Sequence, residues 1–124
     1  MGYSIIVEAH FSAAHRLKGY RGRCETQHGH NWKVEVTISG EKLDKIGMVM
    51  DFKVAKRILS NILSSLDHKD LNKTPPFKKQ NPTSELIAEF IFNRYQKRLK
   101  APLRLKKVMV WETPTSSATF SLDD

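Results

Sequence analysis

The stretch NWKVEVTISGE, residues 31–41, decides the class of fold. Apolar and polar side chains alternate along it, with Trp32, Val34 and Val36 in the apolar set. This period of two predicts a strand that is buried on one face and exposed to water on the other. The segment YSIIVEAHFSAAHRL, residues 3–17, is also extended, and the loop KGYRGRCETQ joins the two. We therefore expect the two strands to pair as a hairpin.

Downstream of this hairpin the apolar pattern changes from that of a strand to that of a helix. Apolar residues spaced by three and four form one stripe over residues 54–66 and another over residues 86–95. Each stripe predicts an amphipathic helix. Asp51 fits the N-cap of the first helix, and Asn81 followed by Pro82 fits the start of the second.

The chain ends in two further strand patterns, LRLKKVMVWET at residues 103–113 and SATFSL at residues 117–122, with the turn residues PTSS between them. The predicted element order is ββααββ. The economical architecture is α+β, with two helices on one face of an antiparallel four-stranded sheet. With no internal repeat or linker, residues 1–124 are expected to form a single domain.

The composition restricts the class of protein. One cysteine excludes an intramolecular disulfide, and the opening residues MGYSIIVEAHF lack the basic and apolar regions of a signal peptide, so a cytoplasmic protein is expected. No apolar run approaches the roughly 18 residues needed to span a bilayer. The formal net charge of +8 fits a nucleic-acid surface, a polyanionic small substrate or a lysine-rich exterior. Charge alone therefore identifies no partner.

The stretch CETQHGHNW, residues 24–32, gathers the only cysteine and two of the five histidines. His28 and His30 are two residues apart in an extended segment, so their side chains project from the same face. His15 is in phase with Phe11 on the first strand, and pairing of the strands can bring it beside the other two. Since zinc favours imidazole ligands, the three histidines are a candidate metal site. The alternative is an ordinary exposed strand start.

Cys24 has three interpretations. As a fourth zinc ligand it would close the tetrahedron and make the site structural. As a free thiol near a cation and the basic Arg21 and Arg23, it would have a lowered pKa and act as a base. As a small buried apolar residue it would have no chemical role, although its polar loop argues against this. Sequence spacing does not choose between the first two.

Two other places in the chain carry carboxylates suited to chemistry. Asp67 and His68 follow the first helical stripe, where the carboxylate can orient the imidazole as a general acid. The alternative is a histidine that only complements the helix dipole. Glu112 ends a strand and can accept two parallel N–H bonds from a planar edge such as that of a pterin or guanine. It fits a solvated strand end equally well.

Six motifs resemble those of the 6-pyruvoyl-tetrahydropterin synthase and 6-carboxytetrahydropterin synthase family, which has the tunnelling fold. In chain order they are FSAAHRL, CETQHGHNW, GMVMDF, LDHKDLN, NPTSE and VWET, and they span the chain nearly from end to end. The resemblance implies zinc on His15, His28 and His30, a base at Cys24, a relay of Asp67 and His68, and a pterin anchor at Glu112.

Three residues separate Cys24 from His28, which is similar to the 6-carboxytetrahydropterin synthases of the queuosine pathway. The resemblance implies a zinc-dependent carbon–carbon lyase that converts 7,8-dihydroneopterin triphosphate to 6-carboxytetrahydropterin, acetaldehyde and triphosphate. A 6-pyruvoyl-tetrahydropterin synthase, which eliminates triphosphate, is the alternative within the family. A zinc-stabilised module that binds nucleic acid is the alternative outside it.

The same resemblance implies the partners of the chain. The substrate is a pterin triphosphate, which the basic loop containing Arg16, Lys18, Arg21 and Arg23 can meet. The assembly is a homo-hexamer, a dimer of trimers with active sites between subunits. Neither nucleic acid nor a membrane is an expected partner.

Overall fold

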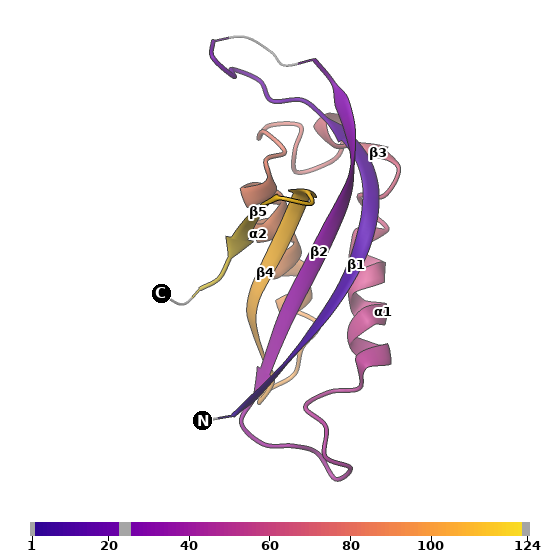
Figure 1. Ribbon diagram of the computed structural model, residues 1–124, viewed down its shortest axis with the longest axis vertical. Helices are drawn as coiled ribbons and strands as arrows, with labels where there is room; N and C mark the ends of the chain where they lie inside the picture. The colour runs from indigo at the N-terminus through magenta and orange to yellow at the C-terminus, as the bar shows by residue number, and fades with distance from the viewer. Residues whose placement is uncertain (1, 23–25, 123–124) are drawn as a thin grey trace.

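The computed structural model describes residues 2–22 and 26–122, and its centre is a five-stranded sheet in the order β3-β1-β2-β4-β5 (Figure 1). The long strands β1 (Tyr3–His15) and β2 (His28–Gly40) pair antiparallel over their whole length, as the alternating pattern predicts. Strand β4 (Arg104–Thr113) pairs antiparallel with β2, and β5 (Ser116–Phe120) pairs antiparallel with β4.

The prediction of a four-stranded, wholly antiparallel sheet is wrong in one respect. A two-residue strand, β3 (Lys69–Asp70), runs parallel to β1 at the edge of the sheet. The chain is held there by the backbone of Ser12, whose N–H donates to Asp67 Oδ1 at 2.8 Å and whose carbonyl accepts from the N–H of His68. So short a strand leaves no periodic signal, which is why the sequence pattern misses it.

Helix α1 (Phe52–Leu63) begins at the predicted cap, where the Asp51 carboxylate accepts a hydrogen bond from the N–H of Lys53. Helix α2 (Ser84–Gln96) begins later than predicted, because its cap is Thr83, which accepts from the N–H of Leu86. A short 3-10 helix (Leu71–Lys73) lies between the two.

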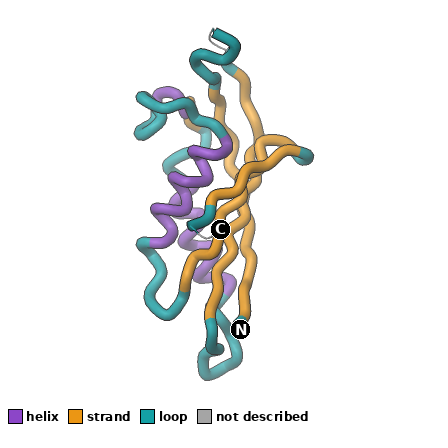
Figure 2. Tube along the Cα trace, turned by 90° about the vertical axis from the view of Figure 1, so that its left-hand side faces the viewer, coloured by secondary structure: helices purple, strands orange, loops and turns teal. Residues whose placement is uncertain are grey.

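Both α-helices lie on the same side of the sheet (Figure 2), and the core fills the space between them and the strands. Trp32, Val34, Val36 and Ile38 are completely buried there, as the period of two predicts. The hydroxyl of Tyr95 in α2 donates to the carbonyl oxygen of Ala55 in α1 at 2.8 Å and ties the two helices together. Within the described residues, no helix is long and apolar enough to cross a membrane.

Candidate metal centre

The antiparallel register of β1 and β2 brings three imidazoles together. His15 lies opposite His28, and Ala13 lies opposite His30, so all three histidines share the face that carries the buried Trp32. The ring centroids of His15 and His28 are 4.7 Å apart, and so are those of His28 and His30. The hairpin thus places His15 beside the other two, which its phase on the first strand had indicated.

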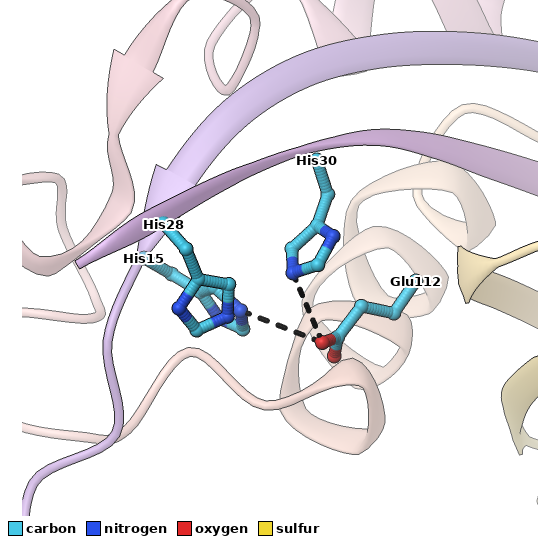
Figure 3. Close-up of side chains that lie close together, drawn as sticks. All are labelled: His15, His28, His30 and Glu112. Carbon is cyan, nitrogen blue, oxygen red and sulfur yellow. Dashed lines mark ion pairs between the residues drawn. The ribbon is translucent and has the colours of Figure 1, made fainter. Parts of the chain in front are cut away.

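A carboxylate from the neighbouring strand completes the group (Figure 3). Lys33 pairs with Trp111 across β2 and β4, so the next residue, Glu112, faces the side of the sheet that carries the histidines. One ligand atom from each of His15, His28, His30 and Glu112 lies within 4.8 Å of the others, a spacing that can hold a metal ion. The resemblance implies that Glu112 anchors the pterin, and its place among the possible metal ligands is an addition from the structure.

Backbone carbonyls orient two of the imidazoles. Nδ1 of His15 lies 2.8 Å from the carbonyl oxygen of Pro82, and Nδ1 of His28 lies 2.9 Å from that of Thr26. A carbonyl only accepts, so each Nδ1 carries a hydrogen, and the neutral tautomer with that hydrogen presents its Nε2 lone pair to the group. An outer partner of this kind is typical of histidines that bind metal.

The burial and hydrogen bonding of His15 show whether a cation fits the group. Its side chain is 2% exposed, and among the described residues its buried Nε2 has no hydrogen-bond partner. Leaving such an atom unsatisfied costs about 1–3 kcal/mol, unless a ligand occupies the position. Imidazole nitrogens with a carboxylate oxygen are also donors that suit zinc. The residues present therefore fit a divalent metal ion.

Trp32 packs against two of the imidazoles from the core side. The ring of Trp32 meets that of His15 edge to face, with centroids 4.9 Å apart, and that of His30 at 5.4 Å. Trp32 is completely buried, and its indole Nε1–H donates to the carbonyl oxygen of Ala13 at 3.2 Å. The hydrogen bond pairs the polar group of the ring and holds the ring in one orientation. This close packing limits the rotation of the His15 and His30 rings.

Glu112 has two distinct oxygen environments. Oε2 lies 3.1 Å from Nε2 of His30 and 3.8 Å from Nε2 of His15. Oε1 accepts from the hydroxyl of Ser84, the first residue of α2, at 3.3 Å. The side chain is 31% exposed, so it can also meet a molecule from solvent. The motif NPTSE contains Pro82 and Ser84, but no sequence pattern predicts their contacts or that of the Thr26 carbonyl, because these contacts depend on tertiary placement.

Asp67 and His68 form a pair at the edge of the sheet, apart from the donor group. Oδ2 of Asp67 lies 3.1 Å from Nδ1 of His68, and the His68 side chain is 82% exposed. The hydrogen bond from the Ser12 N–H, together with the neighbouring His68, lowers the pKa of Asp67 from its ordinary value of 3.8. His68 also has a positive φ of 59°, which is uncommon outside glycine.

His68 lines a cavity of about 590 Å³, and Ser12, Asn31 and His30 belong to the same lining. Ser12 and Asn31 lie opposite each other, one residue out of step with Ala13 and His30, so their side chains point away from the imidazole face. Within the described part of the chain, the donor group contains neither Asp67 nor His68. Cys24 lies outside the described residues.

Comparison with known proteins identifies the family of the chain. The sequence model of the 6-pyruvoyl tetrahydropterin synthase family matches residues 4–123. The dihydroneopterin monophosphate aldolase of Pyrococcus furiosus is 40% identical over 108 residues, covering 87% of this chain and 88% of that protein. The 6-carboxy-5,6,7,8-tetrahydropterin synthase of a Synechocystis species is 36% identical over 121 residues, covering 94% of this chain and 91% of that protein.

A solved structure is similar over the whole chain. The 6-pyruvoyl tetrahydropterin synthase of Caenorhabditis elegans superposes with a TM-score of 0.85 and 29% identity, covering 99% of this chain and 97% of that one. Family match, related sequences and fold therefore lead to the same conclusion. The chain is a member of the 6-pyruvoyl tetrahydropterin synthase family.

Proposed function

We propose that this protein is a zinc-dependent 6-carboxy-5,6,7,8-tetrahydropterin synthase of 7-deazaguanine and queuosine biosynthesis. Its substrates are 7,8-dihydroneopterin triphosphate and water, and its products are 6-carboxytetrahydropterin, acetaldehyde and triphosphate. The observation that carries the proposal is the group of three imidazoles, two of them with Nε2 lone pairs set by backbone carbonyls, beside the carboxylate of Glu112. The synthase related to this chain from Synechocystis supports the choice of reaction.

His15, His28 and His30 would hold the metal ion. Zinc bound there would act as a Lewis acid that lowers the pKa of the hydroxyl groups on the substrate side chain. Three protein ligands leave a coordination position for substrate, which distinguishes a catalytic zinc site from a closed structural one.

The remaining residues take the roles that acid–base chemistry on a pterin needs. Glu112 accepts hydrogen bonds from the N3–H and 2-amino group of the pterin ring and fixes its orientation. Cys24, as a thiolate, removes a proton from the substrate side chain. His68 donates or relays a proton, while Asp67, kept ionised by the Ser12 N–H, holds its ring in position.

The Asp67–His68 pair lies outside the donor group of its own chain, which supports an active site shared between two subunits. In a homo-hexamer built as a dimer of trimers, the pair of one subunit would serve the metal group of another. The exposure of His68, 82% in the single chain, fits a side chain that becomes part of an interface. A subunit of 124 residues would then need no enclosed cavity of its own.

A second candidate is aldol cleavage of a dihydroneopterin monophosphate. It is favoured by the aldolase of Pyrococcus furiosus, which has higher identity to this chain than the Synechocystis synthase does. A 6-pyruvoyl-tetrahydropterin synthase is a third candidate, favoured by the family description and by the likeness to the Caenorhabditis elegans structure. We propose the same metal group for each of the three reactions, which differ in the bond that breaks.

Product analysis separates these candidates. Zinc-loaded protein is incubated with 7,8-dihydroneopterin triphosphate and, in parallel, with the monophosphate, and the products are identified by mass. The proposal expects 6-carboxytetrahydropterin, acetaldehyde and free triphosphate from the first substrate. Cleavage of the monophosphate alone would favour the aldolase, and triphosphate release that leaves all the side-chain carbons on the pterin would favour the 6-pyruvoyl reaction.

A further inference from the structure

A cavity of about 250 Å³ outside the donor group is lined by Lys18, Lys78, Lys79, Gln80 and Asn81. Of the residues that the structure describes, those that line it carry three cationic side chains and no carboxylate. Among the described residues none of these lysines forms an ion pair with an acidic side chain. The cavity is therefore positively charged without internal compensation.

The side chain of Asn81 fixes this cavity. Its Oδ1 accepts from the N–H of Lys18 at 2.8 Å, and its Nδ2 donates to the carbonyl oxygen of the same residue at 2.8 Å. Asn72 holds the backbone of Arg16 in the same way, at 2.8 and 3.0 Å. Two side-chain amides thus attach residues 16–18 to the segment before α2. Lys18 has a fixed backbone, unlike a lysine on a free loop, so less entropy is lost when it binds a ligand.

The same contacts connect the cavity to the metal centre. Asn81 is followed directly by Pro82, whose carbonyl oxygen orients the ring of His15. Lys18 is three residues beyond His15, so their Cα atoms are at most about 11 Å apart. A ligand whose hydroxyl groups lie at the imidazoles can therefore extend a short anionic arm toward the lysines.

We propose that Lys18, Lys78 and Lys79 bind the phosphate groups of the pterin substrate. The inference rests on the proposed function and specifies the part of the protein that recognises the phosphate arm. Three ammonium groups act as donors and point charges for phosphate oxygens, and the side-chain amide of Gln80 can add a donor. Of the three basic loop residues that the structure describes, Arg16, Lys18 and Arg21, only Lys18 lines this cavity. The two other lysines come from the segment before α2.

Calorimetric titration tests the proposal with inorganic tripolyphosphate, 7,8-dihydroneopterin and 7,8-dihydroneopterin triphosphate. The test variant carries Lys18→Gln, Lys78→Gln and Lys79→Gln. A matched control carries Lys42→Gln, Lys45→Gln and Lys53→Gln, which remove the same charge from exposed positions outside the cavity lining. Zinc content and far-UV circular dichroism of both variants establish that the metal centre and the fold are intact.

We expect the test variant to bind tripolyphosphate and the triphosphate substrate at least about tenfold more weakly than wild type. Its affinity for unphosphorylated 7,8-dihydroneopterin should equal that of wild type, and the control variant should bind all three ligands normally. An equal loss in both variants would overturn the proposal in favour of a general charge effect.

Two other results would also overturn it. The first is normal binding of tripolyphosphate by the test variant. The second is loss of tripolyphosphate binding while the triphosphate substrate still binds as in wild type, which would make the cavity a site for free anions. Failure of the proposed function is seen separately, as wild-type protein that turns over no pterin phosphate.

Discussion

Nδ1 of His15 lies 2.8 Å from the carbonyl oxygen of Pro82, 67 residues later in the chain. The contact joins the end of β1 to the segment that leads into α2, and it directs the other ring nitrogen of His15 toward His28, His30 and Glu112. The metal centre is therefore organised by backbone that is itself fixed by the fold. We expect the fold to assemble without the metal, because the buried hydrophobic core between the sheet and the helices does not include the three imidazoles.

The first prediction follows from that independence. His28→Ala should lower the affinity for zinc by more than about 100-fold. Loss of a residue that binds the metal directly is expected to weaken binding at least as much as loss of a residue that only orients such a ligand. The sheet should remain assembled, because the substituted ring belongs to the donor group and not to the core. Zinc content and far-UV circular dichroism measure the two effects. Unfolding together with loss of metal would indicate a structural zinc knot.

Glu112 can be tested by an almost isosteric change. Glu112→Gln should weaken pterin binding by about 1.5–3 kcal/mol, because a charged acceptor is lost and an amide donor faces the N–H edge of the ring. Zinc content should stay at the wild-type level if the carboxylate serves substrate. Titration with 7,8-dihydroneopterin and metal analysis separate the roles: normal pterin affinity with depleted zinc would make Glu112 a metal ligand.

The location of the Asp67–His68 pair leads to a prediction about mixed assemblies. His28→Ala and His68→Ala subunits should each be inactive alone, yet equal mixtures refolded together should recover about one quarter of wild-type activity. That fraction is expected because random assembly leaves one site in four with both intact parts when two subunits contribute to each site. Mixtures as inactive as the separate variants would place both parts of the site in one subunit.

Asp67 should make stability depend on pH in a defined range. Its pKa lies below the ordinary 3.8, chiefly because of the Ser12 N–H, so ionisation of Asp67 favours the folded state. That contribution is fully present above about pH 3.8 and is lost as the pH falls through the lowered pKa. Urea unfolding at fixed protein concentration should give a difference between wild type and Asp67→Asn that is constant from pH 7 to about 5 and shrinks near pH 3. A difference that is the same at pH 7 and pH 3 contradicts this assignment.

Substitution of Cys24 should separate substrate binding from catalysis. Cys24→Ala should retain one zinc per chain and bind substrate, because the imidazoles and the substrate hydroxyl groups complete the coordination shell, but turnover should be lost. The thiol in wild type should alkylate readily near neutral pH and be protected by substrate. Full turnover by the alanine variant would remove Cys24 from the mechanism.

Local patterns in the sequence predicted the parts of the structure that depend on neighbouring residues. Alternation identified β2, helical spacing identified both helices, and the phase of His15 with Phe11 indicated which face of the hairpin it occupies. The features that the sequence patterns did not predict depend on backbone contacts between residues far apart in the sequence. Strand β3 is too short for a periodic pattern, and it forms because Ser12 binds the residues before it.

The start of α2 illustrates the same limit. Asn81 and Pro82 have the residue types of a helix start, but the structure uses them elsewhere: Asn81 binds the backbone of Lys18, and the Pro82 carbonyl orients His15. Thr83 is left to cap the helix. The meeting of Glu112 with the imidazoles could likewise not be predicted from spacing, since it depends on the register between β2 and β4.

The most direct test of an open catalytic centre is the X-ray absorption spectrum at the zinc edge of the resting, zinc-loaded protein. Because the proposed role of Cys24 is that of a base held near the zinc and not that of a ligand, we predict a first shell of nitrogen and oxygen at about 2.0–2.2 Å, unchanged in Cys24→Ala. A zinc–sulfur distance of about 2.3 Å in wild type, lost together with the metal in that variant, would contradict the account and make the centre a closed structural site.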